Sequence, residues 1–286
     1  MKQTKEGLMQ AVFFITACVS VISAILICLF LFSSGLPAIT KIGWGNFIFG
    51  KVWHPSNNIF GIFPMIVGSL YVTAGALLLG GPIGILTAVF MAYFCPENIY
   101  RPLKSAINLM AGIPSVVYGF FGLVVIVPMI RQYIGGFGMG VLAASILLGI
   151  MILPTIVSIS ESSLRAVPES YYEGGIALGA SHERSVFFAV LPAAKRGILA
   201  SVVLGIGRAI GETMAVIMVA GNQAVLPQSL TSGVRTLTTN IVMEMGYSSG
   251  LHRQALIGTA VVLFIFILMI NISFSALQKE EEDGKY

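Results

Sequence analysis

The sequence predicts an all-α membrane protein with six transmembrane helices, and two observations carry this prediction. First, 56% of the 286 residues are hydrophobic and only 10% are charged, with a mean hydropathy of +0.92. A soluble domain carries about 25% charged residues, so a water-soluble enzyme and a disordered chain are both excluded. Second, the charged residues leave gaps long enough for the ~20 apolar residues that a helix needs to cross a bilayer.

Five segments contain no Asp, Glu, Lys or Arg, namely 7–40, 52–96, 105–130, 132–160 and 254–278. A sixth apolar stretch, 197–221, is interrupted only by Arg208 and Glu212. We therefore expect spans near residues 11–32, 66–94, 106–130, 139–160, 198–221 and 255–277. The second is one long kinked helix, because two halves of about 16 residues would each be too short to cross. The first is an uncleaved span, because its apolar run exceeds the ~7 to 15 residues of a signal peptide.

The distribution of basic residues predicts that both termini are cytoplasmic. With the N-terminus inside, ten of the 16 Lys and Arg residues face the cytoplasm and five face outwards, as the positive-inside rule favours. The net charge of +4 therefore reflects topology, and no nucleic-acid partner is expected. We expect an N-terminal transmembrane helix with an outer loop over 1–61 and a core over 62–286, which contains a cytoplasmic loop at 161–196. The outer connections are 33–61 and 222–254.

No catalytic residue, metal or cofactor is expected in this chain. Its three Cys and three His residues are scattered, without the spacing of a metal site. The segment 45–52 has the glycine and lysine spacing of a phosphate-binding loop, but Val52 lacks the hydroxyl that would hold magnesium, and the segment is expected outside the cell. If ATP drives this protein, another chain must hydrolyse it.

The inner loop contains a predicted short helix. Pro168 followed by Glu169 is typical of a helix start, since proline is tolerated in a first turn and acids suit the positive end. We expect the helix to end near Gly179 and to form a compact docking element. An ordinary amphipathic connector is the alternative interpretation.

A resemblance to a known family supports the docking interpretation. The run from Glu173 to Gly179, followed by nine residues and then 189–192, resembles the EAA-x3-G-x9-I-x-LP loop of ABC importer permeases. In that family the loop forms a coupling helix that fits a cleft on the ATPase subunit. The resemblance assigns ATPase coupling to Glu173, Gly174, Gly175, Ala177, Gly179, Leu191 and Pro192.

Arg208 and Glu212 are the second candidate site. A charge near the bilayer centre costs about 2.5–3.5 kcal/mol on insertion scales, so the two together indicate a function. At positions i and i+4 of one expected helix, they would share a face and could neutralise each other. Purely structural pairing of the two charges is an alternative, and a proton relay through Glu212 is another.

A guanidinium at this depth suits a tetrahedral oxyanion. Its planar fork donates two parallel hydrogen bonds, which an ammonium cannot match. Glu212 could hold Arg208 when the pathway is empty, or accept a hydrogen bond from protonated phosphate. Sulfate carries no such proton, so it would meet only an unfavourable carboxylate.

Two segments resemble the signature of phosphate ABC transporter permeases. They are 205–216, with the sequence Gly-Ile-Gly-Arg-Ala-Ile-Gly-Glu-Thr-Met-Ala-Val, and 112–119, with the sequence Gly-Ile-Pro-Ser-Val-Val-Tyr-Gly. The Gly-Glu-Thr-Met-Ala-Val run resembles the PstC-type permease of this system more closely than its partner, the PstA-type permease. The resemblance implies a role in phosphate passage for Arg208 and Glu212. Ser115 and Tyr118 either line the pathway or belong to a kink whose freed backbone groups need a hydroxyl.

The resemblance implies a type I ABC importer (MetI-like) permease fold, with residues 62–286 as the core permease domain. It also implies a multi-pass protein of the bacterial or archaeal plasma (inner) membrane, surrounded by lipid. The partners it implies are a PstA-like second permease, two PstB-like ATP-binding subunits that hold ATP and Mg, and a PstS-like phosphate-binding protein. A PstA-like permease and a molybdate or sulfate permease are the nearest alternatives. Alternatives from other functional classes are a channel or a secondary carrier, neither of which needs a loop that docks on an ATPase, and a membrane-embedded enzyme, for which only Glu212 is available at depth.

Overall fold

The computed structural model describes residues 2–283, and side chains from residue 9 to residue 273. It is almost entirely helical. The sheet found within the described residues is one antiparallel hairpin, formed by β1 (Trp53–His54) and β2 (Ile59–Phe60), in which Trp53 is paired with Phe60. The prediction of an all-α membrane protein is confirmed.

The helical elements follow one another along the chain, and the irregular segment 220–236 separates α12 from α13. They are α1 (Lys2–Ile42), α2 (Trp44–Phe49), the 3-10 turn η1 (Pro55–Asn57), α3 (Phe63–Val89), the π-helical turn η2 (Phe90–Phe94), α4 (Glu97–Gly112), α5 (Ser115–Phe121), the π-helical turn η3 (Gly122–Ile126), α6 (Val127–Tyr133), α7 (Val141–Arg165), α8 (Glu169–Ala177), α9 (His182–Ser185), the π-helical turn η4 (Val186–Val190), α10 (Leu191–Ala193), α11 (Lys195–Gly211), α12 (Met214–Val219), α13 (Leu237–Met245) and α14 (Gly250–Asp283).

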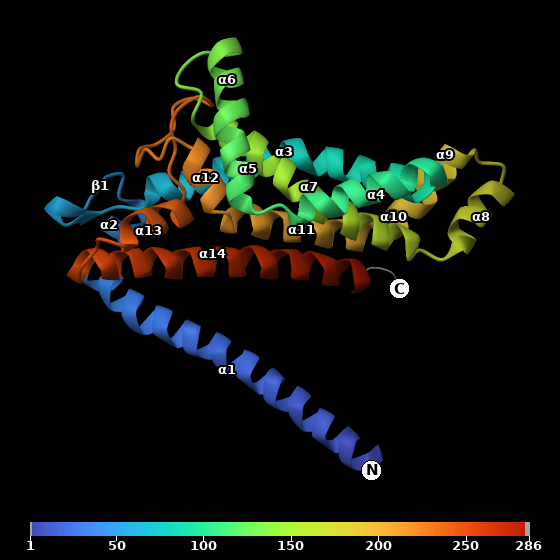
Figure 1. The fold of residues 1–286 in the computed structure, drawn as a ribbon, viewed down its shortest axis with the longest axis horizontal. Helices are drawn as coiled ribbons and strands as arrows, with labels where there is room; N and C mark the ends of the chain where they lie inside the picture. The colour runs from blue at the N-terminus through green and yellow to red at the C-terminus, as the bar shows by residue number, and fades with distance from the viewer. Residues whose placement is uncertain (1, 284–286) are drawn as a thin grey trace.

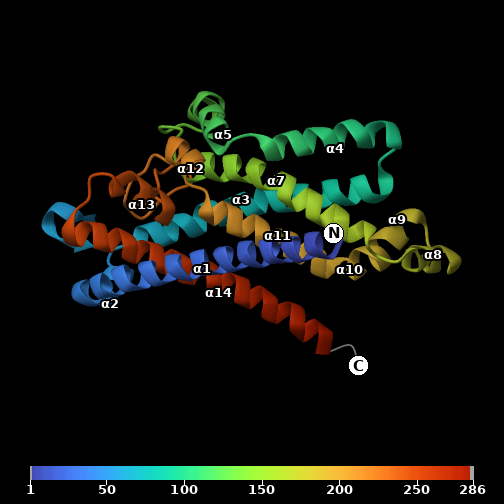
Figure 2. The ribbon, with the colours of Figure 1, turned by 60° about the horizontal axis from the view of Figure 1, so that its bottom comes forward.

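Helices α3, α7 and α11 form the centre of the bundle and run along its long axis (Figures 1 and 2). Small residues let them approach closely, as is usual between helices in membranes. A Cβ on Gly80 of α3 would lie 2.5 Å from the Gly149 carbonyl oxygen of α7, and one on Gly205 would lie 3.2 Å from the Ile156 side chain. The core at these crossings therefore depends on glycine.

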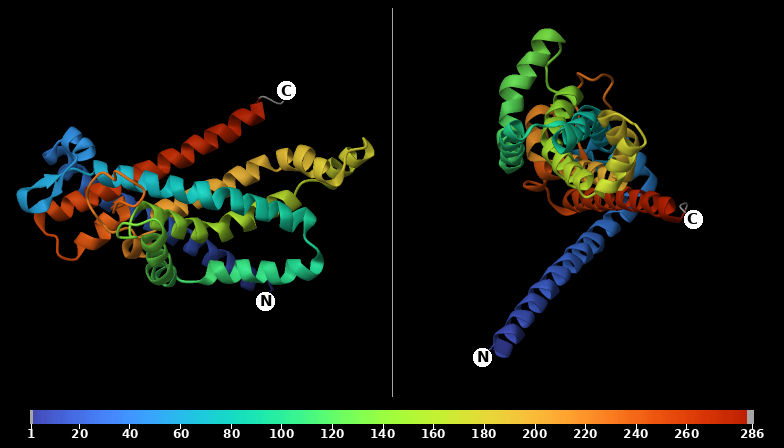
Figure 3. Two further views of the ribbon diagram at one scale, coloured as in Figure 1. Left: turned by 90° about the horizontal axis from the view of Figure 1, so that it is seen from above. Right: turned by 90° about the vertical axis from the view of Figure 1, so that its right-hand side faces the viewer.

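Helix α1 packs against α14 near the hairpin, where the rings of Phe32 and Phe264 meet edge to face at 5.8 Å. Further towards its start, α1 leaves the bundle and stands apart from it (Figures 1 and 3). Both α1 and α14 extend from the hairpin towards the end of the molecule that carries α8. The start of α1 and the end of α14 therefore point to the same end as the predicted inner loop.

Four expected spans are single helices of sufficient length and apolarity, namely 9–42, 63–94, 141–165 and 250–273. The second of these continues unbroken from α3 into η2, as the sequence predicts. Within the described residues, five helical segments are long and apolar enough to cross a membrane alone. A sixth exists only if 182–193 and 195–211, which meet at a bend of 68°, count as one span.

The expected third span, 106–130, is wrong as one helix. Helix α4 ends at Gly112, Ile113 is extended with φ −70° and ψ 127°, and a new apolar segment begins at Ser115. The cause is Pro114, whose ring disfavours helical backbone in the preceding residue. The segment from α5 to α6 consequently crosses α3 and α7 instead of running along them (Figure 1).

The expected fifth span, 198–221, is also divided. Helix α11 ends at Gly211, and Glu212 is extended with φ −70° and ψ 129° before α12 starts at Met214. A further bend lies at Ala194, between α10 and α11. The chain therefore has two helix breaks of nearly the same backbone geometry.

Candidate functional site

The segments that follow the two breaks pack on each other, although they are far apart in the sequence. Helix α12 lies against α5, and the contact is close because it involves glycine. A Cβ on Gly119 would lie 2.7 Å from the sulfur of Met218 and 2.9 Å from the Cα of Ala215. The two signature segments named from the sequence are therefore brought together by this packing.

Arg208 lies in the last turn of α11 and is half-buried. Its Nη1 donates a hydrogen bond to Thr155 Oγ1 of α7 at 3.1 Å. Its side chain therefore turns towards α7. A guanidinium has five N–H donors, and Thr155 is its only hydrogen-bond partner among the described residues. Most of its donor capacity is unused.

Glu212 does not pair with Arg208, so the expected ion pair on one helix face is wrong. The helix ends at Gly211, and the extended backbone at Glu212 takes the carboxylate off that face. Glu212 Oε1 instead accepts the backbone N–H of Ala215 at 3.1 Å, and its carbonyl oxygen accepts the hydroxyl of Thr238 at 3.1 Å. Within the described part of the chain, the second carboxylate oxygen has no partner.

Ser115 and Tyr118 have different positions at the first break. Tyr118 is buried, and its hydroxyl donates to the carbonyl oxygen of Met110 at 2.9 Å. That carbonyl lies in the last turn of α4 and also accepts the backbone N–H of Ile113 at 3.3 Å, so Tyr118 supplies a second hydrogen bond at this helix end. Ser115 is the first residue of α5 and is half-buried. The capping role thus falls to Tyr118, and the Ser115 hydroxyl makes no hydrogen bond to another described residue.

The predicted docking helix is α8, and it forms the tip of the molecule opposite the hairpin (Figures 1 and 2). It starts after Pro168 as predicted, none of its residues is buried, and Leu178 at its end is 90% exposed. Gly179 follows with φ +84°, a conformation that favours glycine and ends the helix.

The motif residues of the loop divide into an exposed group and a packed group. The exposed residues are Glu173, Gly174, Ala177, Gly179 and Pro192. Leu191 is half-buried at the start of α10, and a Cβ on Gly175 would lie 2.6 Å from Ser185 Oγ. One motif glycine therefore faces outwards, and the next allows α8 to pack on α9.

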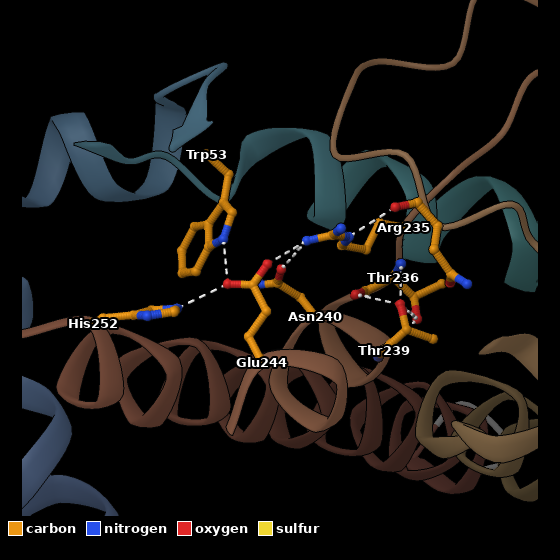
Figure 4. Close-up of polar contacts among 8 residues, drawn as sticks. Trp53, Arg235, Thr236, Thr239, Asn240, Glu244 and His252 are labelled. Carbon is orange, nitrogen blue, oxygen red and sulfur yellow. Dashed lines mark hydrogen bonds and ion pairs between the residues drawn. The ribbon is translucent and has the colours of Figure 1, made fainter. Parts of the chain in front are cut away.

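Sequence reasoning missed a carboxylate cluster near the hairpin (Figure 4). Glu244 of α13 is buried, and its Oε1 accepts Arg235 Nη1 at 2.7 Å. Its Oε2 accepts the indole N–H of Trp53 at 2.9 Å and pairs with His252 Nε2 at 2.8 Å. Arg235 also donates to the side chain of Asn240. Because these residues come from three separate segments, no spacing in the sequence points to them.

A second missed cluster surrounds Glu161 of α7, which is 2% exposed. Its carboxylate accepts Lys104 Nζ at 2.6 Å and Tyr100 Oη at 2.7 Å, both from α4, and Arg165 Nε at 3.0 Å. The hydrogen bond to Glu161 raises the pKa of the Tyr100 phenol. The spacing of Glu161 and Arg165, four residues apart near a helix end, could have indicated part of this cluster.

Long apolar helices that break beside a half-buried cation, and an exposed helix at one end of the bundle, define the class of protein: a multi-pass membrane permease. The chain belongs to the family described as the binding-protein-dependent transport system inner membrane component, which matches residues 80–279. Members of this family are transport subunits of ABC importers and not enzymes. They work with an ATPase, a substrate-binding protein and a second permease.

Curated relatives cover most of the chain. The probable ABC transporter permease YqgH of Bacillus subtilis is 39% identical over 270 residues, which are 90% of this chain and 87% of that protein. The phosphate transport system permease PstC of Pasteurella multocida is 32% identical, over 84% of this chain and 82% of that protein. A probable PstC of Methanocaldococcus jannaschii is 31% identical, over 87% and 85%. The resemblance to PstC-type permeases is therefore confirmed.

Solved structures confirm the MetI-like permease fold. A permease chain of the MetNI methionine ABC transporter, in an inward-facing form, superposes with a TM-score of 0.60 at 19% identity, over 80% of this chain and 99% of that chain. A chain of a bacterial ABC transporter that imports alginate also gives 0.60, at 13% identity, over 92% and 96%. At these identities the likeness concerns the fold alone.

Proposed function

We propose that this chain is the transmembrane subunit of an ATP-driven, high-affinity importer of inorganic phosphate. It would form half of the translocation pathway, and a PstA-like permease would supply the other half. Curated relatives named as PstC phosphate permeases support the substrate, because they match at 31–33% identity over most of the chain. Arg208 and Glu212 retain hydrogen-bonding groups without partners among the described residues, which supports them as the place where phosphate passes.

The single observation that carries the proposal is the environment of Arg208. It has one hydrogen-bond partner among the described residues, Thr155, and no paired carboxylate. A half-buried guanidinium in that state can donate two parallel hydrogen bonds to a phosphate oxygen pair. Arg208 and Glu212 lie on either side of the helix end at Gly211, and the proposal places the passage of phosphate at this break.

Glu212 favours phosphate over its sister oxyanions in this proposal. Its free carboxylate oxygen can accept a hydrogen bond from a protonated phosphate. Sulfate and molybdate carry no such proton at neutral pH, so the carboxylate would repel them. This contrast supports a phosphate importer over a sulfate or molybdate permease.

The remaining parts of the proposal concern topology and partners. Helix α8 would dock on a PstB-like ATPase, which holds ATP and Mg, and a PstS-like protein would deliver phosphate to the outer segments 33–61 and 222–254. Both termini would then be cytoplasmic. The positive-inside distribution supports this orientation, and so does the shared direction of α1, α14 and α8.

The test is phosphate uptake by the complete transporter carrying Arg208→Ala. Loss of two charge-assisted hydrogen bonds, each worth about 1.5–3 kcal/mol, should lower uptake by about 100-fold or more. Arg101→Ala is the matched control, because the Arg101 side chain is 80% exposed and, among the described residues, its one ion pair is with surface Glu97. Normal phosphate uptake by an assembled Arg208→Ala transporter would contradict the proposed pathway.

A further inference from the structure

One histidine makes hydrogen bonds both to helix α8 and to the body of the protein. The hydroxyl of Tyr172 in α8 lies 2.8 Å from Nδ1 of His182, the first residue of α9. On the other side of the ring, His182 Nε2 lies 3.2 Å from the carbonyl oxygen of Tyr93 in η2. The imidazole therefore lies between α8 and the end of the long helix α3.

The roles of the two ring nitrogens follow from their partners. The carbonyl oxygen of Tyr93 can only accept a hydrogen bond, so Nε2 carries the proton that is donated to it. Nδ1 then accepts the hydroxyl proton of Tyr172. One tautomer of His182 satisfies both contacts at once, so the ring is a specific connector and not a filler between apolar surfaces.

Few other contacts hold α8 in place. None of its residues is buried, and its helix contacts are to α9 and η4. The bond from Tyr172 to His182 is the only side-chain hydrogen bond that α8 makes within the described part of the chain. Aromatic rings pack at the same junction. The centroid of the Phe94 ring lies 4.8 Å from that of His182, and the centroid of the Tyr93 ring lies 6.2 Å from that of Tyr172.

The other end of this connection leads into the helices that hold Arg208. The hydroxyl of Tyr93 donates to the carbonyl oxygen of Leu164 in α7 at 3.2 Å. Helix α7 lies along both α3 and α11 and carries Thr155, the partner of Arg208. The contacts are therefore continuous from α8, through His182 and Tyr93, to the helix that positions the guanidinium.

We propose that His182 is the positioning residue through which movement of α8 is passed to α3 and α7. This inference rests on the proposed function, in which α8 docks on an ATPase. It assigns to one side chain the transmission step between ATP hydrolysis and the membrane site. Without the imidazole, α8 can still dock and follow the ATPase, but its displacement is absorbed at the joint with α9.

The experiment uses the complete transporter in proteoliposomes, with both permeases, the two ATPases and the binding protein. Phosphate uptake and ATP hydrolysis are measured in the same sample for wild type, His182→Ala, Tyr172→Phe and the control Tyr171→Phe. Tyr171 is the neighbouring tyrosine of α8, is 52% exposed and has no side-chain hydrogen bond to a described residue. Tyr172→Phe keeps the ring and removes only the hydroxyl, so it tests the connection if His182→Ala fails to assemble.

We expect uptake per ATP hydrolysed to fall about tenfold in His182→Ala, which loses both hydrogen bonds, and about threefold in Tyr172→Phe, which loses one. Hydrolysis without the binding protein should stay at the wild-type rate in both, and Tyr171→Phe should match wild type throughout. A purely structural role would lower uptake and hydrolysis together and leave their ratio unchanged. Wild-type uptake per ATP in Tyr172→Phe, or in an assembled His182→Ala complex, would overturn the proposal.

Failure of the proposed function gives a different result. If the wild-type transporter takes up no phosphate, the substrate is wrong, whatever the variants do. The role of His182 is then judged from stimulation of ATP hydrolysis by the loaded binding protein, which should fall in Tyr172→Phe and His182→Ala but not in Tyr171→Phe. Equal stimulation in all four proteins would contradict the role of His182 independently of phosphate.

Discussion

The Glu244 cluster near the hairpin and the site at the helix breaks both contain an arginine and a glutamate, but they use them differently. Both oxygens of Glu244 are engaged, by Arg235 on one side and by Trp53 and His252 on the other. Arg208 has one hydroxyl partner, and Glu212 accepts one backbone N–H on its side chain. The Glu244 carboxylate has little capacity left for a ligand, whereas Arg208 and Glu212 have donors and an acceptor to spare.

This difference distinguishes buried charges that stabilise the fold from buried charges that remain available to a ligand. Charges inside a protein are tolerated when hydrogen bonds satisfy them, and removing one partner then leaves the others without compensation. A buried carboxylate with both oxygens engaged, as in Glu244, therefore stabilises the fold. An unsaturated pair at a helix break contributes less to stability and is available for a charged substrate. Substitutions in the two regions should accordingly change different measurements.

The largest expected effect is on stability, for Glu244→Ala. The change leaves Arg235 and His252, whose side chains are 15% and 16% exposed, without their shared carboxylate. Breaking such a buried group costs about 3–5 kcal/mol in the free energy of unfolding. Thermal unfolding of the purified complex would show a clear drop in its midpoint. Glu97→Ala is the control, because its ion pair with Arg101 is at the surface and is worth about 0–1 kcal/mol. Equal midpoints for the two variants would show that the cluster is not a structural element.

The positions of the charged residues along the chain were enough to predict most of the fold. Gaps between charged residues predict the helices at 63–94 and 141–165 because a bilayer requires long apolar segments. The breaks at Ile113 and Glu212 are harder to predict from the sequence, because proline and glycine are tolerated inside membrane helices when neighbouring groups satisfy the backbone hydrogen bonds. At the first break Tyr118 does so, and at the second the hydroxyl of Thr238, from a different part of the chain, does so.

The candidate residues could be named from the sequence, but their geometry could not. Arg208 and Glu212 stand out because charge is rare in an apolar stretch, and the spacing of four residues suggests a pair. That pairing required a continuous helix, and the helix ends between them at Gly211. Glu244 and its partners were missed because contacts between separate elements, here β1, α13 and α14, leave no periodic pattern in the sequence.

The second effect in size concerns selectivity, for Glu212→Gln. The amide oxygen of glutamine can still accept the N–H of Ala215, so the start of α12 is preserved and the stability should change by less than about 0.5 kcal/mol. The negative charge is lost, and with it the preference for a protonated oxyanion. We expect the ratio of phosphate to sulfate transport to fall roughly 10-fold to 100-fold, since a hydrogen bond to a charged group is worth about 1.5–3 kcal/mol.

Transport of radiolabelled phosphate with competing sulfate measures this ratio directly. Glu97→Gln removes a carboxylate at the surface, where its side chain is 71% exposed, and should leave the ratio unchanged. If Glu212→Gln keeps the wild-type ratio, the carboxylate has a structural role like that of Glu244, and the contrast between the two regions fails.

The smallest expected effect is that of Thr155→Val, which removes the one hydroxyl that holds Arg208 while keeping the shape of the side chain. Helix α7 should remain intact, because the hydroxyl serves the guanidinium at 3.1 Å and no other described group. A single hydrogen bond contributes about 0.5–1.5 kcal/mol, so phosphate uptake should fall about 3-fold to 10-fold. Thr155→Ser retains the hydroxyl and should restore most of the uptake, whereas equal uptake by the Val and Ser variants would mean that Arg208 needs no positioning from α7. A loss confined to the Val variant would separate this weakly held arginine from Arg235, which three acceptors fix in place.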